Sequence, residues 1–155
     1  MSKEPLPLPQ ELTRELFDLS IAIDLIGQAT ASRLGINQTD LICLDLLARQ
    51  GPLSAGQVAS ALGHTTAAIS AMASRLEAGG YARREMDPDD RRRVLIHASP
   101  SGIEQAFSLF DDLYAAAAEM HSRHDERDLR MLVDLLRGYR LLVDQHTTRL
   151  REAPQ

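Results

Sequence analysis

Apolar residues recur every three or four positions along most of the chain, a spacing typical of amphipathic helices. The pattern predicts a proline-rich, extended arm over residues 1–10 and a long helix over residues 11–33. A second helix is predicted over residues 38–49, with Asn37 as its cap and Asp40 three residues further on. Glycine follows each of these helices, so both are expected to end there.

Two shorter helices with a glycine between them come next. Ser54 and Gln57 have the spacing of a capping box, which predicts the start of a third helix. A fourth helix is expected over residues 64–78, ended by Gly79 and Gly80. Three of its apolar residues share one face and are expected in the core: Ile69, Met72 and Leu76. Two short helices joined by a tight turn that contains glycine predict a helix-turn-helix.

The pattern then changes to two short strands, predicted over residues 81–86 and 93–97. Residues 87–90 between them read Asp-Pro-Asp-Asp, which is favourable turn chemistry. The strands predict a β-hairpin whose tip carries three consecutive arginines, Arg91, Arg92 and Arg93. A hairpin in this position is the wing of a winged helix-turn-helix.

Two long helices are predicted at the C-terminal end, over residues 100–122 and 126–150, the first begun by Ser99 and Pro100. Their apolar residues repeat with near-heptad spacing. These apolar stripes, like that of the first helix, are longer than the core of a small winged helix-turn-helix needs. They favour a two-fold dimer in which both ends of each chain interleave, with a monomeric helical bundle as the alternative.

The expected fold class is therefore mainly α with a small β-hairpin wing (α+β). Three regions are predicted: an N-terminal arm and dimerisation helix over residues 1–36, a winged helix-turn-helix over residues 37–99, and C-terminal dimerisation helices over residues 100–155. A chain of 155 residues is long enough for one domain with such an appendage.

Charge is distributed unevenly along this chain, whose formal net charge is −5. Residues 64–97 hold six basic and five acidic residues, whereas the segments on either side are net negative. Attraction to phosphate must be concentrated there, so double-stranded DNA is the expected partner. No apolar run approaches the roughly 18 residues of a membrane span, and the N-terminus lacks the apolar region of a signal peptide. With the single Cys43 suited to a reducing compartment, we expect a cytoplasmic protein without a membrane partner.

The segment DPDDRRRVLIHASPSG resembles the wing and the start of the fifth helix in MarR-family transcription regulators. SRLEAGGYARR, just before it, resembles the end of their recognition helix and their first wing strand. The resemblance covers nearly the whole length, including the order of six helices and a hairpin. It implies a homodimer that binds a roughly palindromic operator, most simply as a repressor. It also implies release by an oxidant or by a small, mainly apolar or aromatic effector bound between the reading head and the dimerisation helices.

The fourth helix is expected to be the recognition helix, with its outward hydroxyls and ring on phosphates or base edges. The predicted contacts are His64, Thr65, Thr66, Ser70 and Ser74. Ala67 and Ala71 could touch thymine methyl groups. Ala71 departs from the longer polar or basic side chain of many relatives, so we expect modest base readout and a larger share from DNA shape and backbone contacts. The alternative is that these are only solvated helix positions.

The wing arginines are the second predicted contact, near the minor groove or its phosphates. Arg91 and Arg92 follow Asp90 as in the Asp-Arg-Arg motif of the resembled family, and Arg93 extends the cluster. Asp90 is expected to position an arginine through an ion pair. Arg75 is expected to form a structural ion pair, with a phosphate contact as second choice. For the cluster of Arg91, Arg92 and Arg93, the alternative is a solvated hairpin tip.

For the other reactive residues, the sequence favours structural roles. Cys43 lies among apolar residues and is expected to be a buried thiol rather than a redox sensor. His121 and His146 fall on the apolar stripes, as interface histidines or as ligand or pH sensors. His121, His124 and Asp125 lack a clear further ligand for a metal.

Catalytic motifs are missing from the sequence: it has no phosphate-binding glycine loop, no nucleophile elbow and no paired cysteines. We therefore expect neither an enzyme nor a cofactor. Two rival functions stay open, a winged-helix module that binds a protein partner and a redox- or metal-responsive regulator.

Overall fold

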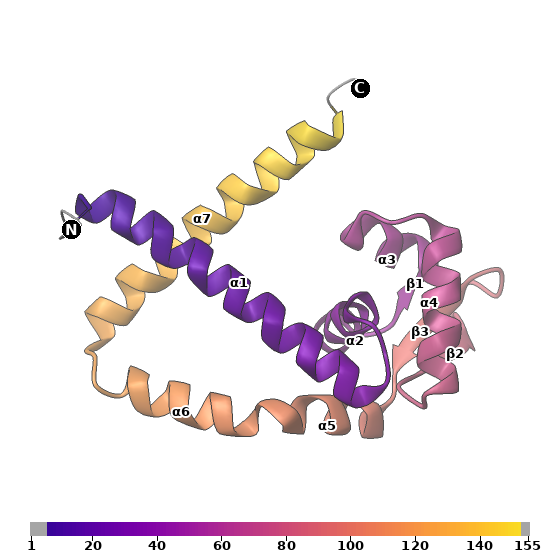
Figure 1. The fold of residues 1–155 in the computed structure, drawn as a ribbon. Coiled ribbons are helices and arrows are strands. Elements are labelled where there is room, and N and C mark those ends of the chain that lie inside the picture. Colours follow the sequence, from indigo (N-terminus) through magenta and orange to yellow (C-terminus); the bar gives the residue numbers. More distant parts are fainter. Residues whose placement is uncertain (1–5, 153–155) are drawn as a thin grey trace. The chain divides into compact units, whose positions relative to one another are not determined.

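The structure is a computed structural model that describes residues 6–152. The chain divides into two units, the first ending at Leu109 and the second beginning at Phe110. The first unit holds helices α1 to α5 and a small sheet, and the second holds helices α6 and α7 (Figure 1). The fold is mainly α-helical with a small antiparallel sheet, as predicted.

Helix α1 spans Leu8–Leu34, so it begins three residues before the predicted start. The expectation of an extended arm over residues 1–10 is therefore wrong for residues 8–10; residues 1–5 lie outside the described part. Proline is tolerated in this first turn because the first amides of a helix have no partner within it. The helix ends at Gly35, as predicted. Its buried residues, Thr30 and Ala31, lie near its C-terminal end.

Helix α2 spans Gln38–Gln50 and begins with the predicted capping box. The Asp40 amide donates to Asn37 Oδ1 at 2.9 Å, and the Asn37 amide donates to Asp40 Oδ2 at 3.4 Å. These two bonds satisfy amides that a helix start otherwise leaves unpaired. The helix buries one apolar face in the core: Leu41, Cys43, Leu44 and Leu47.

Helices α3 (Ala55–Leu62) and α4 (Thr66–Ala78) form the predicted helix-turn-helix. Ser54 caps α3, and the Thr65 hydroxyl caps α4 by accepting from the amide of Ala68 at 3.2 Å. Helix α4 therefore starts two residues after the predicted His64. Between the helices, Gly63 has a φ of 68°, in the left-handed region that glycine tolerates best.

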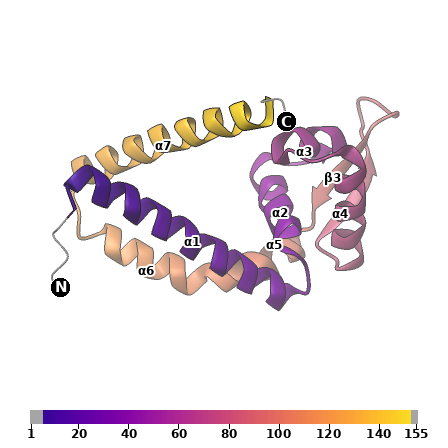
Figure 2. The ribbon, with the colours of Figure 1, turned by 45° about the horizontal axis from the view of Figure 1, so that its top comes forward.

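The sheet has three strands, β1 (Leu53–Ser54), β2 (Ala82–Met86) and β3 (Val94–Ala98), in the order β1-β3-β2 and antiparallel throughout. Strands β2 and β3 are the predicted hairpin, and the loop between them projects beyond α4 in both views (Figures 1 and 2). Strand β1 was not predicted, because two residues are too few to show an alternating pattern and Ser54 also caps α3.

The core of the first unit lies between α2, α3, α4 and the sheet. All three predicted core residues of α4 are buried there, together with Leu44, Val58 and Ile96. Gly80 supplies the positive φ, 77°, that turns the chain from α4 into β2, whereas Gly79 is right-handed. Gly102, in α5, is packed so closely that an added Cβ would lie 2.6 Å from Tyr81 Cα.

The predicted continuous helix over residues 100–122 is wrong. Helix α5 spans Pro100–Phe107, a 3-10 turn η1 covers Ser108–Phe110, and α6 spans Asp111–His121. At the break, Ser108 Oγ donates to the Gln105 carbonyl at 3.1 Å, a local bond of the kind that competes with regular helix. The apolar spacing continues across this break, so the pattern does not reveal it.

Helix α7 spans Glu126–Glu152, close to the predicted range. Neither α6 nor α7 buries a residue, and many large apolar side chains of α7 are exposed. Within residues 6–152, no helix is both long enough and apolar enough to cross a membrane.

Candidate nucleic-acid interface

The five residues predicted to contact DNA from the recognition helix, His64, Thr65, Thr66, Ser70 and Ser74, are all exposed. Three of them are already hydrogen-bonded within the protein. Thr65 caps α4, Ser70 Oγ donates to the Thr66 carbonyl at 3.0 Å, and Ser74 Oγ donates to the Ser70 carbonyl at 3.1 Å. Ala67 and Ala71 are exposed as well, so α4 presents mainly short side chains to solvent.

Arg84 on β2 reaches this same helix, a contact that was not predicted from the sequence. Its Nη2 donates to the Ser70 carbonyl at 2.6 Å and to Ser74 Oγ at 3.1 Å, and its Nη1 pairs with the Glu77 carboxylate. Ala82, two residues earlier in the strand, is buried, so strand alternation could have placed Arg84 on the inward face.

Arg75 forms the predicted structural ion pair. Its Nη2 and Nε donate to the two carboxylate oxygens of Asp40 at 2.6 and 3.0 Å. Asp40 is fully buried, and hydrogen bonding to it raises the pKa of Arg75. The pair ties the recognition helix to the start of α2, and it commits Nη2 and Nε of Arg75 to this structural role.

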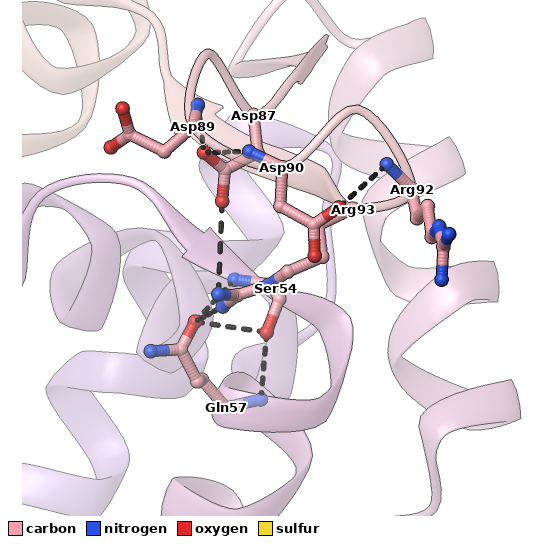
Figure 3. Close-up of polar contacts among 7 residues, drawn as sticks. All are labelled: Ser54, Gln57, Asp87, Asp89, Asp90, Arg92 and Arg93. Atoms are coloured by element: carbon pink, nitrogen blue, oxygen red, sulfur yellow. Dashed lines mark hydrogen bonds and ion pairs between the residues drawn. The ribbon is translucent and has the colours of Figure 1, made fainter.

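The wing loop between Asp87 and Arg93 is ordered by its own carboxylates (Figure 3). Asp87 Oδ1 accepts from the amides of Asp89 and Asp90 at 2.9 and 3.4 Å. Asp90 Oδ1 accepts from the Arg92 amide at 3.0 Å. The predicted ion pair of Asp90 with an arginine does not form among the described residues, because its short carboxylate instead closes the turn onto the backbone two residues on.

Arg93 is anchored beneath the loop rather than free at its tip. Its Nη2 donates to Gln57 Oε1 at 3.3 Å, and its Nη1 lies 3.8 Å from Asp87 Oδ2 (Figure 3). Gln57 Oε1 also accepts from the amide and hydroxyl of Ser54, in the capping box of α3. The wing is therefore fastened to the first helix of the helix-turn-helix. The sequence contains both Gln57 and Arg93, but it does not predict that their side chains form a contact.

Among the arginines of residues 64–97, Arg91 and Arg92 are the two whose guanidinium groups remain available. Both are exposed, and no described residue hydrogen-bonds or pairs with either side chain. By contrast, Arg83 pairs with Glu85 at 2.5 Å, and hydrogen bonding to Arg83 lowers the pKa of Glu85. The net positive segment thus concentrates its free positive charge at the tip of the wing.

Cys43 is the buried thiol that was predicted. It is fully buried in the core, and burial raises its pKa to about 11, with the Asp40 carboxylate as the second cause. His121, His124 and His146 are exposed. Residues 6–152 contain no group of three or more side chains placed to hold a metal ion.

Comparison with known proteins agrees with this architecture. A family model described as the MarR family matches residues 34–93. The HTH-type transcriptional regulator YcgE of Bacillus subtilis (strain 168) is 31% identical over 128 residues, which cover 83% of this chain and 83% of YcgE.

Two solved structures share the fold. A MarR family protein from Bacillus stearothermophilus has a TM-score of 0.68 and 16% identity, over 87% of this chain and 94% of that one. A MepR variant of S. aureus bound to an oligodeoxyribonucleotide has a TM-score of 0.56 and 23% identity, over 84% of this chain and 97% of that one. With the helix-turn-helix, the wing and the similarity to YcgE taken together, the chain belongs to the MarR family of DNA-binding transcription regulators.

Proposed function

We propose that this chain is a repressor that binds a roughly palindromic operator as a homodimer and is released by a small ligand. One observation carries the proposal: two available guanidinium groups, on Arg91 and Arg92, stand at the tip of a wing beside an exposed recognition helix. Guanidinium groups bind phosphates and narrow minor grooves well.

In this proposal α4 of each subunit enters a major groove, and the two half-sites lie about 10 bp apart. The helix contributes His64, Thr65, Thr66, Ser70 and Ser74. Arg91 and Arg92 bind the flanking backbone or minor groove. Arg93 and Asp90 support the wing, through the bonds to Gln57 and to the Arg92 amide, and Arg93 adds positive charge nearby.

Homodimer formation is supported by the apolar side chains that a single chain leaves in solvent. Phe17, Ile21 and Leu25 of α1 are 57 to 67% exposed, and Leu141, Leu142 and Val143 of α7 are 56 to 61% exposed. Exposed apolar surface of this extent is typical of an interface. A symmetric dimer also supplies the two heads that a palindromic operator requires.

Ligand control is proposed from membership of the family. An aromatic acid or a similar apolar effector would change the spacing of the two heads and so weaken operator binding. Thermal unfolding and operator binding measured over a panel of aromatic acids test this step. A compound that raises the melting temperature and lowers operator affinity supports it, and a panel without such a compound contradicts it.

The proposed function is tested by gel-shift titration and protection footprinting on the DNA that flanks the gene of this protein. We expect a protected site with two-fold symmetry and retardation that weakens steeply with salt. Binding that is equal on all duplexes would contradict an operator. No binding to DNA together with stable binding to a protein partner would favour the interaction module instead.

A further inference from the structure

Arg84 joins the recognition helix α4 to the wing, the two parts of the winged helix-turn-helix (the head, residues 37–99) that are proposed to touch DNA. It lies on β2, in the stem of the wing, and its guanidinium group meets three acceptors on α4. The Ser70 carbonyl, Ser74 Oγ and the Glu77 carboxylate lie on neighbouring turns of one side of that helix. One planar group therefore holds about two turns of the recognition helix against the wing.

The base of the Arg84 side chain is fixed by the core. Arg84 is paired across the sheet with Ile96 of β3, which is 2% exposed. Directly opposite residues of antiparallel strands share a face, so Arg84 leaves the sheet on the side of the core and of α4. Its side chain is 31% exposed, as is that of Glu77, so solvent screens this pair less than the pairs at the surface.

Three of the five N–H donors of Arg84 are used by these contacts. Nη1 is paired with a carboxylate and Nη2 is shared between a carbonyl and a hydroxyl, so the charge of Arg84 is balanced within the head. A lysine could not replace it, because a single ammonium group cannot place donors at both ends of this acceptor row.

We propose that Arg84 is a positioning residue for operator binding: it sets the placement of α4 relative to the wing and makes no contact with DNA. This inference rests on the proposed function. Specific binding needs the helix and the wing to meet the duplex together, whereas non-specific binding needs mainly positive charge. Loss of Arg84 must then reduce the preference for the operator more than it reduces attraction to DNA in general.

Arg83 provides a matched control on the same strand. It carries the same charge, it is half exposed, and it pairs with Glu85 rather than with α4. Arg83→Ala and Arg84→Ala therefore remove the same net charge one residue apart, and only the second removes the contact with the recognition helix. Arg84→Lys keeps the charge while removing the forked geometry, and serves where the alanine variant is poorly folded.

The test uses the full chain and a duplex that the wild-type protein selects from a randomised library, with a scrambled duplex beside it. For Arg84→Ala and Arg84→Lys we expect specific affinity to fall about tenfold or more, comparable to one or more mismatched base pairs. In both Arg84 variants, the affinity for the scrambled duplex and the slope of log affinity against log salt should stay at their wild-type values. The control Arg83→Ala should stay within about twofold of wild type in its affinity for either duplex. Full specific affinity in either Arg84 variant, an equal loss on both duplexes, or a reduced salt slope would overturn the inference.

Hydrogen exchange without DNA separates this inference from the proposed function. Amides of α4 and β2 should exchange faster in Arg84→Ala than in Arg83→Ala, because the contact that joins these elements is lost. Equal exchange in the two variants would overturn the role of Arg84 whether or not the wild-type protein selects an operator. A failure of the wild-type protein to select any duplex would instead refute the operator-binding function.

Discussion

Cys43 shows how burial decides the chemistry of a single residue. The thiol has no exposed surface, and its pKa is raised from 9.0 to about 11. It therefore has almost no thiolate at neutral pH, which is the form that reacts with oxidants and disulfide reagents. A role of this residue in peroxide sensing would require the core to open first.

We predict that Cys43 in the native protein does not react with a disulfide reagent at pH 8 and reacts fully after denaturation. The raised pKa also means that the folded state holds the thiol proton more tightly than the unfolded chain does. Its contribution to stability is complete below about pH 9 and is lost as the pH rises towards 11, by about 2 kcal/mol. Denaturant unfolding between pH 8 and 11 should show this loss. The slope of the free energy of unfolding against pH should be smaller in Cys43→Ala. Equal slopes in the two proteins, or rapid native labelling, would contradict the burial.

The ion pair of Arg75 with Asp40 differs from the surface pairs because its carboxylate is fully buried. We predict that Arg75→Ala lowers the free energy of unfolding by roughly 3 kcal/mol, since it leaves a buried charge without its main partner. Arg83→Ala, which breaks an exposed pair, should lower it by less than about 1 kcal/mol. Urea unfolding of both variants at one protein concentration makes the comparison, and equal losses would mean that Asp40 is satisfied by water.

At the scale of elements, the wing loop depends on Asp87, whose carboxylate holds two amides of the turn and faces Arg93. Asp87→Ala should speed hydrogen exchange of the loop and weaken specific DNA binding severalfold, although the variant is less negative. Asp89→Ala removes the same charge from a side chain that points away from these contacts (Figure 3), and it should bind DNA at least as tightly as wild type. Tighter binding by both variants would show that charge, not loop order, governs the wing.

Local signals predicted most elements well, because caps and glycine stops act within a few residues. The boxes at Asn37 and Ser54 gave the starts of α2 and α3, and the apolar face of α4 gave its core residues. Strand β1 and the 3-10 turn at residues 108–110 were missed. Strand β1 is too short to show an alternating pattern, and the 3-10 turn interrupts a helix without interrupting its apolar spacing.

The candidate site was predictable in its location but not in its division of roles. Arginine clusters at residues 83–84 and 91–93 are visible in the sequence, yet which guanidinium groups are used internally depends on contacts between distant segments. Arg93 meets Gln57 and Arg84 meets Ser70, 36 and 14 residues away along the chain. For the same reason the role expected for Asp90, an ion pair, was replaced by a backbone contact.

For the whole molecule, the exposed apolar residues of α1 and α7 make association of two copies the expected state. Sedimentation equilibrium should give twice the 17.1 kDa mass of one chain. Leu142→Asp should shift the protein towards monomer, because it places a charge where an apolar side chain, 60% exposed in the single chain, is expected to be buried between two copies. Gln145→Asp adds the same charge to a polar position of α7 and should stay dimeric. A wild-type monomer at micromolar concentration would contradict the dimer.

In the proposed function, an acidic molecule holds DNA through the arginines at the tip of its wing. The salt dependence of operator affinity measures these contacts, because each phosphate contact contributes about 0.9 to the slope of log affinity against log salt. Replacing both Arg91 and Arg92 by alanine removes four guanidinium groups from a dimer, so the slope should become shallower by up to about 3.6. A double variant with the wild-type slope and affinity would show that the wing does not bind the phosphates.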